Sequence, residues 1–304
     1  MIDLAPQALR GSLPPLVTPF RDGAVDFETY ATLVHWHADQ GSHGVVVAGT
    51  TGEPSVLTVA ERRRLTEVAV EAAAGRIEVV AATGSQSHAE TIELTEHAAA
   101  VGADAVLIVT PYYLKPPKRG LVRYFVDLAG RTGLPLLVYH IPGRAAVGVD
   151  IDVLTEIAEA APTFVGMKHA VADLGLVTES LLRFGAEFRV LVGLEELSYP
   201  MLALGATGMV NAVANVVAGR IVDLYRAVAE GGFADARAIH QSLFELNRAV
   251  FFDTNPIPVK YMMWRIGLLP SNEHRLPMMP PSPDVAARLD KVLVEAGLDL
   301  VHGP

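Results

Sequence analysis

Short apolar runs alternate with longer segments of helical spacing eight times along the 304-residue chain. The runs are rich in Val, Ile and Leu at consecutive positions, which is typical of strands buried on both faces of a parallel sheet. Eight strand-then-helix units in series predict an α/β fold, a closed (β/α)8 TIM barrel. The runs occupy 13–20, 44–52, 77–84, 105–112, 135–142, 163–169, 188–193 and 207–215.

The segments between the runs carry helix signals. Thr58 and Glu61 have the spacing of a capping box, and glycines follow several of the segments, where helix C-termini favour them. We therefore predict helices over 27–40, 59–74, 89–101, 120–131, 153–160, 174–184, 198–204 and 220–229.

An open, doubly wound sheet uses the same alternation of elements. No Gly-x-Gly-x-x-Gly or Gly-Lys-Ser/Thr motif follows any run, so the nucleotide fingerprint of that fold is missing and we favour the barrel. Three more helical segments follow, at 233–252, 258–267 and 284–296. We expect a barrel over 1–230 that carries the active site, and a C-terminal three-helix extension over 231–304.

Charge and cysteine content exclude several function classes. The chain has 24 Lys and Arg against 34 Asp and Glu, a net charge of −10, whereas nucleic-acid binding favours a basic surface. Zero cysteines exclude disulfides, thiolate metal sites and a cysteine nucleophile. No apolar run reaches the ~18 residues that span a membrane, and the N-terminus has no signal-peptide pattern. We expect a soluble cytoplasmic protein with no metal, nucleic-acid partner or membrane partner.

Active sites of such barrels lie at the C-terminal ends of the strands, so polar residues where the runs end are the candidates. The chain has five lysines, and only Lys168 ends a run that looks buried. Burial disfavours an ammonium group and lowers its pKa, which suits an amine that attacks a carbonyl to form a Schiff base. Alternatively, Lys168 extends into solvent or pairs with a carboxylate such as Asp173.

Two further side chains are expected at the same end of the barrel. Tyr139 ends the strand before that of Lys168, and a phenol held near an amine and a hydroxyl can relay protons. Arg144 follows in a Pro-Gly-Arg loop and could bind a carboxylate through two N–H groups. The alternatives are a packed core tyrosine and a solvated loop arginine.

The motifs together resemble dihydrodipicolinate synthase and the wider family of pyruvate-dependent class I aldolases that includes N-acetylneuraminate lyase. They occur in order over nearly the whole chain. The motifs are Gly49-Thr50-Thr51-Gly52-Glu53, Pro111-Tyr112-Tyr113, Tyr139 with Pro142-Gly143-Arg144, Gly166-Met167-Lys168 and Asn255-Pro256-Ile257-Pro258-Val259-Lys260.

The resemblance implies a catalytic set. Lys168 would form the Schiff base with pyruvate, so that no other cofactor is needed. Thr50 and Tyr139 would relay protons, and Tyr113 would complete the relay by reaching into the neighbouring subunit's site. The partners implied are small 2-oxo acid and aldehyde substrates and further copies of the chain, in a homotetramer built from dimers with shared active sites.

The resemblance also implies a substrate-binding set. Thr51, with Thr50, would bind the pyruvate carboxylate through hydroxyl and backbone N–H groups. Arg144 would hold the carboxylate of the incoming aldehyde. Gly193 and Val210 would line the pocket for the pyruvate methyl group.

Three positions depart from the usual family pattern: His140 and His169 replace Asn, Asp or Glu, and Leu194 replaces Asp. The histidines are either acid/base groups at the substrate end or neutral packed side chains, and we favour packing. The simplest function is condensation of pyruvate with aspartate semialdehyde to 4-hydroxy-tetrahydrodipicolinate. The departures leave open a catabolic class I aldolase or hydratase acting on a 4-hydroxy-2-oxo acid or a sugar-derived 2-oxo acid. A catalytically silent ligand-binding barrel is the alternative from another class.

Overall fold

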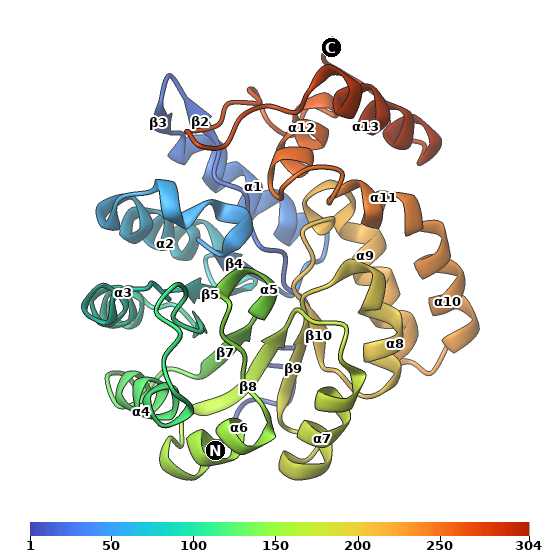
Figure 1. Ribbon diagram of the computed structural model, residues 1–304. Helices are drawn as coiled ribbons and strands as arrows, with labels where there is room; N and C mark the ends of the chain where they lie inside the picture. The colour runs from blue at the N-terminus through green and yellow to red at the C-terminus, as the bar shows by residue number, and fades with distance from the viewer. Residues whose placement is uncertain (304) are drawn as a thin grey trace.

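The computed structural model describes residues 1–303 and confirms the predicted TIM barrel (Figure 1). Eight parallel strands form one sheet, and an isolated bridge between Pro15 and Val46 joins its two edges. In the order in which they pair, the strands are β1 (Gly11–Ser12), β10 (Gly208–Met209), β9 (Arg189–Val192), β8 (Phe164–His169), β7 (Leu136–His140), β6 (Ala105–Val109), β5 (Glu78–Ala82) and β4 (Gly44–Val47). A separate antiparallel hairpin joins β2 (Phe20–Arg21) to β3 (Ala24–Val25).

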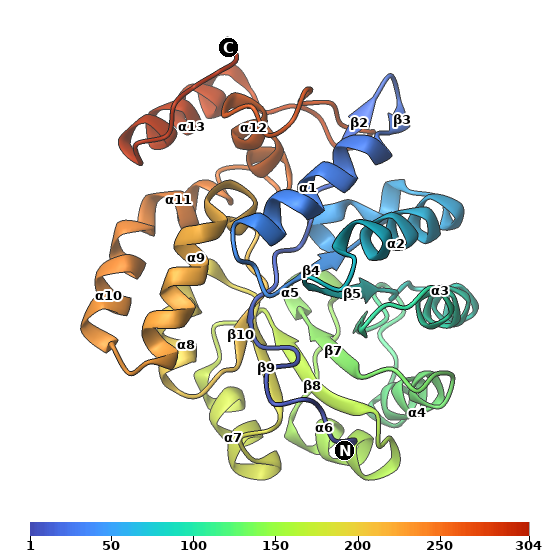
Figure 2. The same ribbon diagram turned by 180° about the vertical axis from the view of Figure 1, so that it is seen from behind.

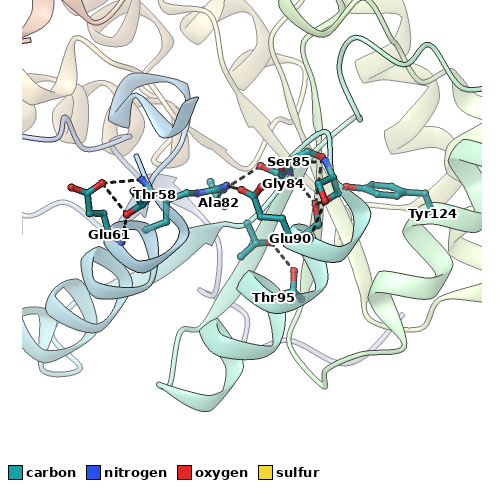
Figure 3. Close-up of polar contacts among 12 residues, drawn as sticks. Thr58, Glu61, Ala82, Gly84, Ser85, Glu90, Thr95 and Tyr124 are labelled. Carbon is teal, nitrogen blue, oxygen red and sulfur yellow. Dashed lines mark hydrogen bonds and ion pairs between the residues drawn. The ribbon is translucent and has the colours of Figure 1, made fainter. Parts of the chain in front are cut away.

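Helices surround the strands, and several begin where a short polar side chain caps the first turn. Asp26, Thr58, Ser87, Asp150 and Asp173 each accept a hydrogen bond from a backbone N–H three residues later. The predicted capping box at Thr58 is confirmed (Figure 3). The barrel helices are α1 (Phe27–Asp39), α2 (Val59–Ala73), α3 (His88–Ala100), α4 (Lys118–Ala129), α5 (Pro142–Ala145), α6 (Ile151–Ala160), α7 (Leu174–Phe184), α8 (Ser198–Ala203) and α9 (Ala214–Ala229).

A buried arginine ties two of these helices to the sheet. Arg62 of α2 donates to the backbone oxygens of Ala82 and Gly84, at 3.0 and 3.1 Å, and to the Glu90 carboxylate of α3 at 2.9 Å. Figure 3 labels these three partners. The ion pair and the two carbonyls satisfy both terminal nitrogens of the guanidinium where water is largely excluded, whereas its Nε has no partner in residues 1–303. The contacts fix α2 and α3 against the C-terminal end of β5.

The first barrel strand lies before its predicted run, and the last is shorter than predicted. The run 13–20 contains Pro14 and Pro15, which lack the N–H that a ladder needs, so regular pairing stops at Ser12 and only the Pro15 bridge follows. The predicted strand over 207–215 is reduced to Gly208–Met209, because α9 already begins at Ala214.

Four helices follow the barrel: α10 (Phe233–Ser242), α11 (Phe244–Ala249), α12 (Ile257–Arg265) and α13 (Pro283–Glu295). The segment predicted as one helix over 233–252 is divided at Leu243 into α10 and α11. Figures 1 and 2 place α13 beside α12 and α11, with α12 between α13 and the β2–β3 hairpin. Arg275, in the loop between α12 and α13, donates to the Gly23 carbonyl of that hairpin at 2.8 Å.

The N-terminal segment runs across the end of the barrel at which the strands begin (Figure 2). Leu9 N donates to the Glu78 carboxylate at 2.9 Å, and the buried Arg189 donates to the Ala8 carbonyl at 2.8 Å. These bonds join the segment to the first residues of β5 and β9, so it covers the N-terminal ends of the strands. In residues 1–303, no helix is long and apolar enough to span a membrane.

Candidate active site

Lys168 and Tyr139 lie side by side inside the barrel. They are opposite each other in the pairing of β8 with β7. Leu137 and Tyr139 belong to the apolar cluster in the barrel interior, whereas Val138 belongs to the cluster between strands and helices. Alternation along the strand therefore turns Tyr139 and its partner Lys168 inward. Lys168 is only 5% exposed, and its Nζ lies 4.2 Å from the centroid of the Tyr139 ring.

A tight turn after β4 brings Thr50 to the same place. Thr50 and Thr51 lie in the 3-10 turn Thr50–Gly52, and Thr50 Oγ1 is 3.3 Å from the Tyr139 hydroxyl. Thr18 donates to the Gly52 carbonyl at 2.7 Å and fixes the turn from below. The Lys168 amine thus lies over the Tyr139 ring, and the Tyr139 hydroxyl meets the Thr50 hydroxyl, so the three groups are neighbours.

Gly193 and Val210 shape the space around the lysine. A Cβ on Gly193 would lie 2.9 Å from Lys168 Cε, closer than real Cβ contacts, so only glycine leaves room for the lysine chain. Val210 is buried in the same interior cluster as Tyr139. Both residues therefore contribute to the packing at the base of the site.

A cavity of about 300 Å³ lies next to this group: Thr50 and Tyr139 are in its wall, whereas Lys168, Thr51, Gly193 and Val210 are not. Arg144 of α5 lies at its wall, is exposed, and pairs with no carboxylate within residues 1–303, so its guanidinium is available to an anion. The wall residues are Ala48, Gly49, Thr50, Glu53, Pro54, Ser55, Val56, Ala82, Gly84, Leu107, Val109, Tyr112, Tyr139, Ile141, Arg144, Ala145, Thr254, Asn255, Pro256, Pro277 and Met278.

Tyr113 is the one predicted catalytic residue that the structure does not bring to the site within a single chain. Its side chain is 86% exposed, and its backbone adopts a left-handed φ of 72°. Its neighbour Tyr112 lines the cavity, whereas Tyr113 does not. Within one chain Tyr113 therefore completes no polar path to Tyr139.

A model of the dihydrodipicolinate synthetase family matches residues 8–296. The chain belongs to this family. It is 40% identical over 291 residues to 4-hydroxy-tetrahydrodipicolinate synthase of Aquifex aeolicus, covering 96% of this chain and 99% of that one. The crystal structure of dihydrodipicolinate synthase from Aquifex aeolicus matches with a TM-score of 0.94, over 96% and 100% of the two chains. A monomeric dihydrodipicolinate synthase variant matches at 34% identity and a TM-score of 0.92, over 96% and 99%.

Sequence reasoning missed the part of the cavity wall that comes from beyond the barrel. Thr254, Asn255 and Pro256 precede α12, and Pro277 and Met278 belong to the loop before α13. The available signals were the Asn-Pro run, which we read only as a family motif, and the Pro-rich stretch before the last helix. Neither signal predicts that its loop forms part of the cavity wall.

The two histidines that depart from the family pattern lie outside the cavity. His140 and His169 are the strand neighbours of Tyr139 and Lys168, so alternation turns them outward, and both are buried. Their Nδ1 atoms are 3.3 Å apart, and His169 Nε2 donates to the Asp173 carbonyl at 2.9 Å. This assigns His169 Nδ1 as acceptor and His140 Nδ1–H as donor in the neutral pair. Both histidines are thus packed side chains, as the sequence predicted.

The pair predicts a loss of stability in mild acid. Burial, followed by the neighbouring His169, lowers the pKa of His140 from 6.5 to about 4, and burial also lowers that of His169. Below pH 6.5 these histidines therefore bind protons in the unfolded chain but not in the folded chain. The free energy of unfolding falls as the pH drops toward 4. For His140 alone, the free energy of unfolding should fall by on the order of 2 kcal/mol between pH 7 and pH 5.

Urea unfolding at a series of pH values tests this expectation on wild type and His140→Asn. The difference between the two chains isolates the histidine from the many carboxylates that also titrate. The variant should show the shallower decline between pH 7 and pH 5, and parallel curves would contradict the assignment.

Proposed function

We propose that the protein is a 4-hydroxy-tetrahydrodipicolinate synthase, a lyase of the class I aldolase type that condenses pyruvate with aspartate semialdehyde. One observation carries the proposal: the buried Lys168 amine lies 4.2 Å from the ring of Tyr139, whose hydroxyl meets Thr50, beside a cavity that Arg144 flanks. Full-length relatives at about 40% identity carry this enzyme name, which supports the substrate pair.

In the proposed reaction, neutral Lys168 attacks the pyruvate carbonyl carbon, and loss of water gives an iminium ion. Removal of a proton from the methyl carbon then gives an enamine, whose carbon attacks the aldehyde carbon while the aldehyde oxygen takes up a proton. The amino group of the aldehyde substrate then displaces Lys168 from the iminium carbon, which closes the ring and returns the free amine. Each step moves a proton at nitrogen, carbon or oxygen, and the Thr50 and Tyr139 hydroxyls, 3.3 Å apart, are placed to carry it. The amine is the only covalent group required, so the proposal includes no bound cofactor.

The remaining residues bind the substrates in this proposal. Thr51 and Thr50 hold the pyruvate carboxylate at the turn after β4. Gly193, which has no Cβ beside Lys168, and the buried Val210 line the pocket for the methyl group. Arg144, free of any protein carboxylate in residues 1–303, binds the carboxylate of the aldehyde.

The positions that depart from the family pattern do not favour the catabolic alternative. His140 and His169 face the helix layer, away from Tyr139 and Lys168. These two departures therefore do not alter the barrel interior in which the Schiff base would form. A silent barrel is disfavoured because the amine, phenol and hydroxyl are all present and in contact.

A panel of aldehydes tests the substrate. Purified protein is given pyruvate and either aspartate semialdehyde or a neutral aldehyde of equal length, and pyruvate consumption and product mass are followed. We expect turnover of the acidic aldehyde, which engages Arg144. Turnover of other aldehydes but not of aspartate semialdehyde would reject the synthase assignment in favour of a different aldolase.

We further propose that barrel 1–230 and extension 231–304 form one working unit in a homotetramer of dimers. The exposed Tyr113, on a strained backbone, supports a role in a neighbour's site. A monomeric variant is among the solved structures that the chain resembles, so assembly needs its own test.

Mixing two inactive variants tests the shared site. If Tyr113 acts across subunits, a heterodimer of Tyr113→Phe and Lys168→Ala chains has one intact site. Random exchange then makes half of the dimers mixed, and activity should reach about a quarter of wild type. Native mass spectrometry of differently tagged chains verifies the exchange. Verified exchange without recovered activity would mean that Tyr113 serves its own chain or no site.

A further inference from the structure

A fully buried ion pair joins the extension to the turn that carries the threonines. Lys260 of α12 donates to Glu53 Oε1 at 3.0 Å, and the two side chains are 0% and 2% exposed. Lys260 Nζ also lies 4.4 Å from the centroid of the Phe20 ring. The proposed mechanism uses neither charge.

Glu53 occupies a backbone position that controls the Thr50–Thr51 turn. It lies between the 3-10 turns Thr50–Gly52 and Pro54–Val56, with a left-handed φ of 57° that non-glycine residues rarely adopt. Its backbone N–H donates to the Thr50 carbonyl at 3.1 Å. A displacement of the Glu53 side chain should therefore shift Thr50, because the two residues are joined by one hydrogen bond and three peptide units.

A second contact runs from the extension to the same turn. Asn255, just before α12, donates from Nδ2 to Thr51 Oγ1 at 3.0 Å. Asn255 and Glu53 both line the cavity. The beginning of α12 thus holds both Thr51 and Glu53, the residues on either side of Gly52.

Stability alone is a poor explanation for this ion pair. Withdrawing two charges from water offsets most of their attraction, so buried pairs seldom stabilise more than apolar side chains of the same size. Glu53 Oε2 has no hydrogen-bond partner in residues 1–303, and His274 Nδ1 is 3.8 Å away. The ion pair instead fixes the position of the Glu53 carboxylate, because Lys260 is its one hydrogen-bond donor in residues 1–303.

We infer that Lys260 is a positioning residue of the proposed active site: by holding Glu53, it sets the Thr50–Thr51 turn where Thr50 meets the Tyr139 hydroxyl. The inference rests on the proposed function and assigns to the C-terminal extension a part in catalysis without contact with substrate. Displacing catalytic groups by about 1 Å is enough to cost up to ~10²-fold in rate.

Three variants separate positioning from simple support of the fold. Lys260→Met removes the donor, and Glu53→Gln/Lys260→Met also removes the carboxylate charge that would be left unpaired. Arg265→Met is the matched control: it breaks another ion pair of α12, to Asp290 at 2.7 Å, and neither residue lines the cavity. For each variant, Tm is measured, together with kcat/KM for pyruvate per active site, the sites being counted by borohydride trapping of pyruvate.

We expect Lys260→Met to lower kcat/KM for pyruvate by about 10- to 100-fold per site, and Arg265→Met to change it by less than about twofold. The double variant should regain part of the lost Tm, because no buried charge stays unpaired, while its kcat/KM stays low. If Lys260→Met gives no folded protein, the double variant decides. A kcat/KM per site at the wild-type value in the double variant would overturn the positioning role.

The two levels of the proposal fail separately. Wild-type protein that traps no pyruvate at Lys168 would overturn the proposed function itself. Wild-type protein that traps pyruvate, combined with Lys260 variants of normal kcat/KM, would overturn only the inference about Lys260.

Discussion

Replacing Lys168 by alanine should lower kcat by a factor on the order of 10³ or more, because no lysine lines the cavity that could form the iminium ion in its place. The side chain is 5% exposed, and Gly193 leaves room beside it, so truncation does not disturb the packing of another bulky group. Tm should therefore change far less than activity. The measurement is steady-state condensation of pyruvate with aspartate semialdehyde, beside a thermal unfolding curve.

A matched control is Lys291→Ala, which removes an exposed lysine of α13 whose nearest carboxylate is Glu295. Its kcat should equal that of wild type within error. Condensation by Lys168→Ala at a rate close to that of the control would mean that covalent catalysis by this lysine is wrong.

Replacing Tyr139 by phenylalanine should lower kcat by about 10²- to 10³-fold while leaving the fold intact. Phenylalanine retains the ring that packs 4.2 Å from Lys168 Nζ and removes only the hydroxyl that meets Thr50 at 3.3 Å. Proton transfer then depends on water. Pyruvate should still form the trapped adduct on prolonged incubation, so the defect is in the rate.

Thr50→Val and the Tyr139→Phe/Thr50→Val double variant show whether the two hydroxyls act together. If they form one relay, the double variant should be hardly slower than Tyr139→Phe, because the path is already broken. The control is Tyr261→Phe, which loses a hydroxyl bonded to Asp290 at 3.0 Å; neither residue lines the cavity. A Tyr139→Phe variant as fast as this control would exclude the relay.

The sequence predicted the barrel because its signal is repeated: eight buried runs each followed by a helix admit few topologies. The same repetition predicted that Tyr139 and Lys168 would be neighbours, since consecutive strands of a barrel are paired. Prediction failed where one local property outweighed the apolar pattern. In 13–20, two prolines remove the ladder donors, and at 207–215 a helix start overrides the strand pattern.

The sequence could not predict whether a strand side chain points into the barrel or toward the helices where this direction depends on strand register. A shift in the pairing of β7 with β8 lies between Leu136 and Leu137, and it determines that Lys168 opposite Tyr139 points inward while His140 and His169 point outward. The sequence also carried no sign that the C-terminal extension contacts the turn that carries Thr50. Glu53 and Lys260 are 207 positions apart, and no local pattern indicates that α12 inserts a charge behind the Thr50 turn.

Borohydride reduction in the presence of pyruvate tests the central claim most directly. The protein is incubated with pyruvate, reduced, and analysed by intact mass and then by peptide mapping, with a sample reduced without pyruvate as control. The account predicts one pyruvate-derived adduct per chain, on the peptide that contains Lys168, and none in the control. An unmodified Lys168, or an adduct on another lysine, would contradict it.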